Sequence, residues 1–267
     1  MPEFDHATPV TISLRLHRGE AKVFAEQRRT VQVDITEAGA DASEKFTVQL
    51  DGDTLIVHAP EGMPWQWRLY PRTKIVIRVP EGSSLAAKSA SADIRAAGRY
   101  ATVQASLQSA DVEVEQVDGD AQLKASSGDL KLAHVGGALR LSSSSGDIEV
   151  GDVTGDVSID TASGDITIGA AGASVKAETA SGDVEIGLLR RGKAWFKTAS
   201  GDVSVGVAAG TGVWLDLSTA AGSTSNNLSM AATPSGDQQQ AALELGVRTA
   251  SGDIDVHRVV GGASVAA

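Results

Sequence analysis

Residues 151–187 read GDVTGDVSIDTASGDITIGAAGASVKAETASGDVEIG and repeat the turn sequence Ser-Gly-Asp at a step of 18 residues. Degenerate Ser-Ala-Asp copies extend the series backward, and later copies follow at longer steps. The turn aspartates are Asp93, Asp111, Asp129, Asp147, Asp165, Asp183, Asp202 and Asp253. A fixed period near 20 residues is typical of solenoids, in which each repeat buries its apolar face only by stacking on its neighbours. The sequence therefore predicts an all-β, single-stranded β-solenoid with 18-residue coils.

Each coil consists of two short strands. In the coil that starts at Asp147, apolar Ile148 and Val150 alternate with polar residues, and the alternation resumes after a second Gly-Asp turn at Gly155. Gly provides the backbone angles of such turns, and Asp can hydrogen-bond to the backbone nearby. Stacking residues 18 apart predicts two internal ladders, which comprise Ile148, Ile166 and Val184, and Thr161, Thr179 and Thr198.

The repeat does not cover the whole chain. Residues 1–85 lack it but contain alternating segments such as VTISLRL (10–16) and KIVIRV (74–79), and we expect them to form an N-terminal β region that caps the solenoid. Residues 86–267 form the solenoid. Near its end, Ser223 occupies the Asp position of a degraded turn, and the polar stretch 229–240 predicts a loop before the pattern resumes.

Composition and charge exclude several classes of protein. The formal net charge of −11 repels a phosphate backbone, and the adjacent basic pairs at 28–29 and 190–191 are too few to compensate, so we expect no nucleic-acid partner. There is no Cys, which favours a reducing compartment. The N-terminus MPEFDHATPV has neither the basic start nor the apolar run of a signal peptide or membrane span. We therefore expect a cytoplasmic protein without membrane contact.

Three segments resemble a known family. These are the repeated T-A-S-G-D-[IV] turns, the entry sequence IVIRVPEGSSL (75–85), and the closing WLDLSTAAGSTSNNL followed by VRTASGDIDVHR. The chain resembles the bacterial putative-adhesin domain family of unknown function, a family of β-strand repeat proteins, and looks like its actinobacterial members. The resemblance covers nearly the whole chain. It implies a right-handed β-helix behind an N-terminal β region, and it carries no catalytic residues.

The recurring Asp permits a second interpretation, a calcium site. Nonapeptide β-rolls bind Ca²⁺ between coils, but they use a G-G-x-G-x-D pattern whose several glycines open the backbone carbonyls to the ion. Each turn here has one Gly followed directly by Asp. The pattern favours turn-forming aspartates in a structural ladder, with no metal and no cofactor.

An enzyme is the third class considered. Eighteen residues also equal three hexapeptides, as in left-handed acyltransferase helices, but the apolar spacing within a coil fits two halves of nine better. No G-x-S-x-G nucleophile elbow occurs. The histidines are scattered, at His6, His17, His58, His134 and His257. We therefore expect no catalytic activity.

Tryptophan marks one candidate contact. Trp65 and Trp67 lie in the Pro-flanked segment GMPWQWRLYP, which predicts either a staple over the solenoid end or a protein-contact patch, because Trp is enriched in binding hot spots. We expect Trp195, Phe196 and Trp214 to be bulky fillers where the coil widens.

The sequence thus predicts a non-catalytic cytoplasmic binding or scaffolding protein that presents a repetitive acidic β-helix surface to an unknown protein partner. The alternative is an adhesin-like surface protein, exported without a recognisable signal peptide. A solenoid ends in unpaired strand edges, and only residues 256–267 and the polar loop are available to cover the C-terminal one. We therefore expect that a homodimer, if it forms, joins two chains tail to tail through this end.

Overall fold

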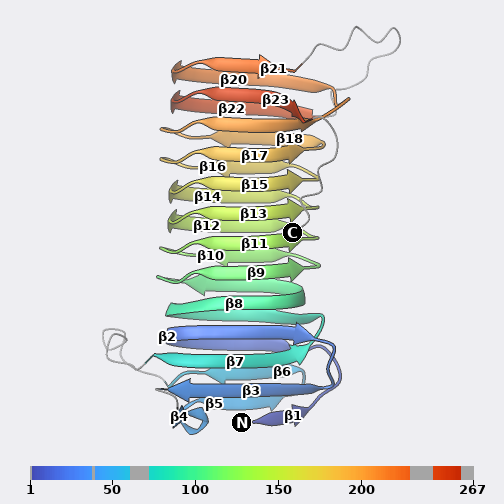
Figure 1. Ribbon diagram of the computed structural model, residues 1–267, viewed down its shortest axis with the longest axis vertical. Coiled ribbons are helices and arrows are strands. Elements are labelled where there is room, and N and C mark those ends of the chain that lie inside the picture. Colours follow the sequence, from blue (N-terminus) through green and yellow to red (C-terminus); the bar gives the residue numbers. More distant parts are fainter. Residues whose placement is uncertain (1, 38–39, 61–71, 229–242, 260–267) are drawn as a thin grey trace. The chain divides into compact units, whose positions relative to one another are not determined.

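The fold is all-β, as predicted. The computed structural model describes residues 2–37, 40–60, 72–228 and 243–259, which form 23 strands and one 3₁₀ turn (Figure 1). Within these ranges, no helix is long and apolar enough to cross a membrane. The chain divides into two compact units, an N-terminal unit of residues 1–146 and a C-terminal unit of residues 147–267. This division differs from the change of sequence pattern at residues 85–86.

The N-terminal unit contains twelve strands in its described residues. They are β1 (Glu3–Asp5), β2 (Thr11–Glu26), β3 (Thr30–Glu37), β4 (Ala40–Asp41), β5 (Thr47–Asp51), β6 (Thr54–His58), β7 (Thr73–Pro80), β8 (Ser83–Leu107), β9 (Val112–Val117), β10 (Ala121–Lys124), β11 (Leu130–Val135) and β12 (Leu139–Ser145), with the 3₁₀ turn η1 (Ser43–Lys45) before β5.

The C-terminal unit contains the other eleven. They are β13 (Ile148–Val153), β14 (Val157–Ser163), β15 (Ile166–Ala171), β16 (Val175–Glu178), β17 (Val184–Leu189), β18 (Gly192–Lys197), β19 (Val203–Ala208), β20 (Val213–Ala221), β21 (Thr224–Asn227), β22 (Leu243–Ser251) and β23 (Ile254–Val259).

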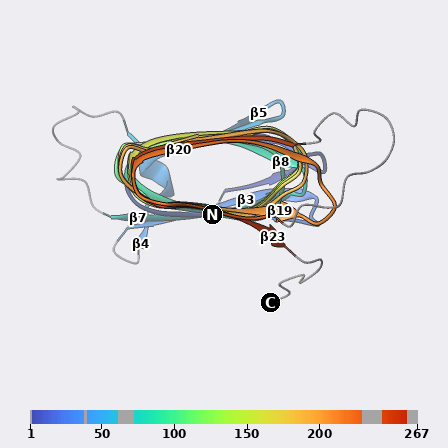
Figure 2. The same cartoon turned by 90° about the horizontal axis from the view of Figure 1, so that it is seen from above.

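Each repeat is a coil of two strands, so that the coils of either unit, seen end on, have strands along two long sides (Figure 2). In the C-terminal unit, β15 pairs in parallel with β13 on one side and β17 on the other. Ile148, Ile166 and Val184 are direct ladder partners and are at most 1% exposed, which confirms the predicted internal ladder. Their burial provides the main stabilisation, at roughly 1.5–3 kcal/mol for each fully buried aliphatic side chain.

The turn glycines are required by two constraints. Gly182 has φ +142°, a conformation that side chains rarely adopt. A Cβ at Gly182 would also lie within van der Waals overlap of the backbone carbonyl of Gly164 in the preceding coil. At this position of the C-terminal unit, the backbone conformation and the close approach of the preceding coil both require Gly at the centre of the turn.

The first long strand is inserted into the stack. One half of β2 pairs in parallel with β6 and its other half with β7, while β8 pairs along the whole opposite edge of β2 (Figure 1). Strands β6 and β7 therefore supply the coil that lies beyond β2. Because Ile12, Leu14 and Val23 are almost fully buried, β2 needs a coil on each side.

Antiparallel strands cover the coil formed by β6 and β7. Strand β5 pairs with β6, β3 pairs with β7, and β1 pairs with β3, all antiparallel. Antiparallel additions of this kind end a parallel stack and protect its edge.

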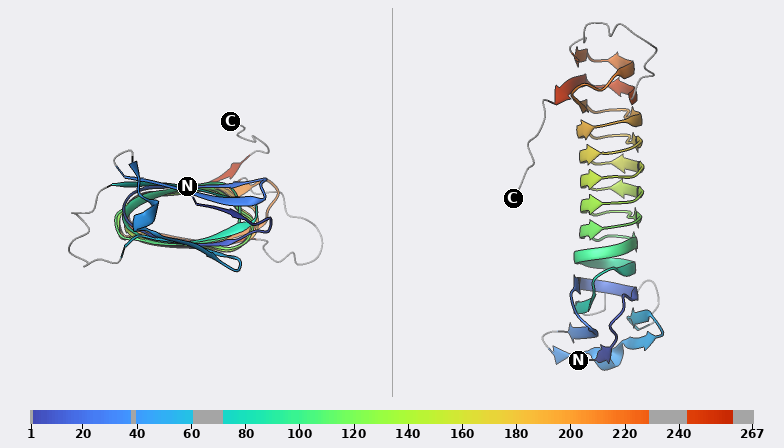
Figure 3. Two further views of the ribbon diagram at one scale, coloured as in Figure 1. Left: turned by 90° about the horizontal axis from the view of Figure 1, so that it is seen from below. Right: turned by 90° about the vertical axis from the view of Figure 1, so that its right-hand side faces the viewer.

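The C-terminal unit also has an inserted coil. Strands β22 and β23 lie between β18–β19 and β20–β21, so the coil order differs from the chain order (Figure 3, right view, red strands). The expectation that residues 256–267 cover the end of the solenoid is wrong for Val256, which is 0% exposed and is covered by β21. The inward residues of the two strands explain why β23 is covered and β21 is not. The inward residues of β23 are the apolar Ile254 and Val256, whereas their partners in β21, Thr224 and Asn226, are polar and tolerate water.

The prediction of bulky fillers is correct for one aromatic residue of three. Phe196 is fully buried in the core. Trp195 points outward and lies over Gly246, where a Cβ would clash with its ring. Trp214 is 57% exposed. Both tryptophans lie on the outer surface because they alternate with inward residues in their strands.

Candidate functional site

The turn aspartates are hydrogen-bond acceptors between coils. In the N-terminal unit, the backbone N–H of Asp111 donates to the Asp93 carboxylate at 3.2 Å, and that of Asp129 donates to Asp111 at 3.0 Å. In the C-terminal unit the same bonds, 2.7–3.0 Å long, link successive coils and involve Asp147, Asp165, Asp183, Asp202 and Asp253. Each carboxylate therefore satisfies a backbone donor of the next coil. The described residues hold no group of three or more potential metal ligands.

The series ends at Ser223, which occupies the Asp position as its sequence suggests. Its backbone N–H and its hydroxyl both donate to the Asp253 carboxylate, at 2.7 and 3.0 Å. These bonds, the backbone one first, lower the pKa of Asp253. A serine in the last coil offers no carboxylate to a further coil, so the ladder of turn carboxylates stops there.

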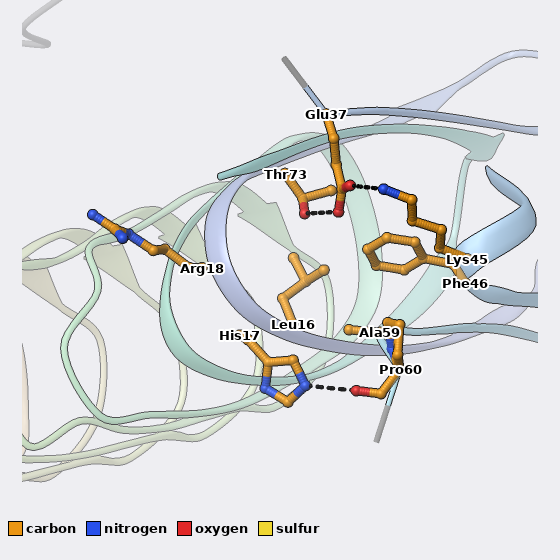
Figure 4. A pocket seen from close by; sticks show the side chains of 9 residues that line it. All are labelled: Leu16, His17, Arg18, Glu37, Lys45, Phe46, Ala59, Pro60 and Thr73. Atoms are coloured by element: carbon orange, nitrogen blue, oxygen red, sulfur yellow. Dashed lines mark hydrogen bonds and ion pairs between the residues drawn. The ribbon is translucent and has the colours of Figure 1, made fainter. Parts of the chain in front are cut away.

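A hollow of about 240 Å³ lies among β2, β3 and β7 in the N-terminal unit (Figure 4). Glu37 points toward Lys45, whose ammonium lies 2.6 Å away, and accepts a 3.2 Å hydrogen bond from the Thr73 hydroxyl. His17 donates to the Pro60 carbonyl at 2.9 Å. The polar groups in this hollow thus bind one another and join β3, η1 and β7, so we interpret it as a structural joint.

The other candidate of the sequence analysis, Trp65 and Trp67, lies outside the described residues.

One side of the N-terminal unit carries mainly basic charges. Its segments 11–16, 54–58, 83–90, 102–107, 121–124 and 139–145 contain no Asp or Glu, and the antiparallel strand β5 adds Asp51 at its edge. We call the exposed cations of this side the basic face, and they are Arg15, Lys88, Lys124 and Arg140.

The stacking register brings these cations together. Arg15 pairs directly with Lys88, and Ser106 separates Lys88 from Lys124 in the same column. In the adjacent column Arg140 pairs with Gln122. Strand spacing is about 4.8 Å, so the four cations are distributed over about 19 Å along the stack.

Neutral hydrogen-bonding groups lie between the cations. Ser13, Gln104, Ser106 and Gln122 line an open hollow of about 350 Å³ together with Arg15, Lys88 and Lys124. His58, in register with Arg15, shares a 2.9 Å hydrogen bond with Ser13. Burial and the charge of Arg15 lower the pKa of His58, so its imidazole favours the neutral form.

The opposite side of the same unit has charges of both signs, several of which are paired. Glu20 is bound by Lys22 at 3.3 Å and by Arg95 at 2.8 Å, and Arg95 also contacts Glu113 at 3.4 Å. Within the described part of the chain, no such ion pair involves the four cations of the basic face. They are therefore available to an external anion.

The C-terminal unit presents a different surface. We call β20 and β21 the terminal coil, because β22 and β23 pair with one edge of it and no described strand pairs with the other. Its residue Trp214 is the one large apolar side chain that is exposed among the described residues. Nearby, Arg248 lies 4.8 Å over the Trp195 ring and 3.6 Å from the Asp216 carboxylate.

Sequence reasoning missed the basic face, and it expected residues 256–267, not β20 and β21, at the C-terminal edge. It considered only basic residues adjacent in the chain, whereas Arg15 and Lys88 are neighbours in the stack. Part of the signal was present, since the 18-residue step aligns Gln104 with Gln122 and Arg140, and Ser106 with Lys124. The position of Arg15 could not be found in this way, because it depends on the insertion of β2.

Comparison with known proteins places the chain in a family without an assigned function. Residues 11–257 match the family model described as Toastrack DUF4097. A putative adhesin of Bacteroides fragilis is similar in structure, with a TM-score of 0.47, 13% identity, and coverage of 96% of this chain and 95% of that one. A putative cell adhesion protein of Clostridium sporogenes has a TM-score of 0.24 and 10% identity, with coverage of 96% and 94%. No curated protein matches. At these scores neither structure assigns a function to this chain.

Proposed function

The chain belongs to the Toastrack DUF4097 family, and we propose that it is a non-catalytic cytoplasmic scaffolding protein that pairs tail to tail through its terminal coil. The observation that carries the proposal is the outer edge of β20 and β21, with which no strand of the described residues pairs, beside the exposed Trp214. An unpaired strand edge recruits another strand, and Trp is enriched in protein contacts.

The apolar residues of the terminal coil support a protein contact. Val213, Leu215 and Leu217 occupy inward positions but remain partly exposed. Their ladder partners in the inserted coil, Leu243, Leu245 and Val247, are 0% exposed. A further coil placed on β20 would bury these side chains in the same way, which is favourable by roughly 25 cal/mol for each Å² of apolar surface covered.

Charge favours a second copy as the occupant. Each chain has a formal net charge of −11, so two copies repel one another over most of their surface. The terminal coil holds a single charged residue, Asp216, which is paired with Arg248 at 3.6 Å. Two copies can therefore approach through this coil with little electrostatic cost, and a partner rich in charge gains nothing there.

Symmetry specifies how two copies would meet. A two-fold axis perpendicular to the stack brings equivalent edges together in antiparallel orientation. With the axis through β20, this strand pairs with its own copy. The apolar positions Leu215 and Leu217 then face those of the partner, and the polar Thr224 and Asn226 face their equivalents.

The test is the mass of the protein in solution, measured by light scattering across a range of concentrations. We expect the parent protein to dimerise and Trp214→Arg to be monomeric, because the variant places a like charge at the edge of both copies. Thr167→Arg adds the same charge at an exposed outward position of β15 and should leave the dimer unchanged. A parent protein that stays monomeric at high concentration would refute the proposal. Cell fractionation tests the location, and recovery of the protein outside the cytoplasm would contradict that part.

A further inference from the structure

The basic face of the N-terminal unit has no role in the pairing proposed above, and its chemistry points to a separate ligand. We infer that it binds a short acidic segment of a partner protein, whose carboxylates contact Arg15, Lys88, Lys124 and Arg140. The argument depends on three properties of this surface, which are its unpaired charge, its interleaved neutral groups and its limited length.

Cations without carboxylates between them distinguish this side from the opposite one. On the opposite side, Arg95 and Lys22 are neutralised by Glu20 and Glu113. On the basic face, the segments between the cations hold no carboxylate at all. Arginine binds carboxylates in a bidentate manner, and lysine supplies a mobile point charge. Arg15 beside Lys88 therefore forms a pair of adjacent anion contacts.

The groups between the cations match a polypeptide. Gln104 and Gln122 each have an amide that can donate and accept, and Ser13 and Ser106 have hydroxyls that can do the same. These four side chains line the open hollow together with Arg15, Lys88 and Lys124. A peptide carries backbone N–H and C=O groups between its carboxylates, so it can satisfy both kinds of group on this face.

The length of the surface limits the ligand. The four cations extend over about 19 Å, which an extended peptide covers with about six residues. A long polyanion would continue beyond the basic face into the field of a protein with a net charge of −11, where it is repelled. The lining residues of the hollow include no aromatic side chain on which nucleic-acid bases could stack. A short acidic segment is attracted by the basic face and does not extend into the repulsive field of the rest of the protein.

The experiment measures binding of a fluorescein-labelled octaglutamate peptide to the full chain by fluorescence anisotropy at low ionic strength. We expect saturable binding that weakens as salt is added, because salt screens exposed charges. Octaglutamine, which has the same length and backbone without the charge, should bind at least tenfold more weakly. Absence of octaglutamate binding at low salt would overturn the inference.

Matched charge reversals locate the site. The double variant Lys88→Glu/Lys124→Glu should weaken octaglutamate binding at least tenfold. The double variant Lys74→Glu/Lys131→Glu makes the same change in net charge at two exposed positions on the opposite side and should leave binding unchanged. Equal losses in the two variants would show that the net charge, and not the basic face, controls binding.

Two competing anions test the class of ligand. Octathymidylate and tripolyphosphate should displace the peptide poorly. If either binds the parent protein more tightly than octaglutamate and loses affinity in Lys88→Glu/Lys124→Glu, the ligand is a phosphate polymer and the inference of a polypeptide is wrong. Because Trp214 lies in the other unit, the outcome of the dimer test does not alter these results.

Discussion

Truncation of Ile166 tests whether the apolar ladder stabilises the stack. Ile166 is 0% exposed and is paired directly with Ile148 on one side and Val184 on the other. Ile166→Ala removes three carbon atoms, and their transfer alone is worth about 2.4 kcal/mol at about 0.8 kcal/mol per carbon. The neighbouring coils are hydrogen-bonded at a fixed spacing and cannot collapse into the void, so a cavity contribution is added. We expect a total loss of about 3–4 kcal/mol.

The control is the next residue along the strand. Thr167 is exposed on the outer surface of β15, and Thr167→Ala should change stability by about 0.5 kcal/mol or less. Urea unfolding followed by tryptophan fluorescence gives the midpoint for each variant, and an unchanged slope shows that the difference is one of stability. Equal midpoints for Ile166→Ala and Thr167→Ala would refute the inward and outward assignment.

Three further predictions concern turns, protonation and metal. Gly182→Ala should destabilise the C-terminal unit strongly because of its positive φ and the neighbouring carbonyl, whereas Gly212→Ala, with open space around it, should be tolerated; equal urea midpoints would contradict this. The folded-state pKa of His58 lies below its ordinary 6.5, so the neutral form is favoured in the folded protein, and stability should fall as the pH drops below about 6.5 through the folded pKa. His58→Gln should reduce that pH dependence of the urea midpoint, and an unaltered slope would contradict it. Because each turn carboxylate already accepts a backbone hydrogen bond, millimolar Ca²⁺ and chelator should give the same thermal midpoint within a few degrees; a large Ca²⁺-dependent rise would mean that the ion binds the folded state.

The repeat was predictable because its causes are local in the coil. Ile148, Ile166 and Val184 recur at one step and face inward by simple alternation, and the structure stacks them as the step predicts. The Gly of the Ser-Gly-Asp turns follows from backbone geometry in the same way, since these glycines have a positive φ. Where the same environment recurs every 18 residues, the position of a side chain in the coil can be predicted from its residue number.

The order in which the coils stack could not be predicted from the repeat length. Strand β22 has the same alternation as any other coil strand, and nothing in its own residues shows that it lies between β18 and β20. The outermost position goes to the coil whose inward side chains tolerate exposure to water on one side. That comparison involves residues from both coils. The same holds for β2, which is inserted between β8 and a coil that begins only at Thr54.

The amino-acid sequence by itself determined the kind of fold, the length of a coil and the inward ladder, since each follows from residue type and spacing along the chain. The tertiary structure alone decided which surfaces are open. Arg15 and Lys88 are 73 positions apart and become neighbours because β2 enters the stack beside β8. Trp214 lies in the terminal coil because β22, which follows it in the sequence, is inserted between β18 and β20. Both outcomes depend on contacts between distant segments, for which local periodicity carries no information.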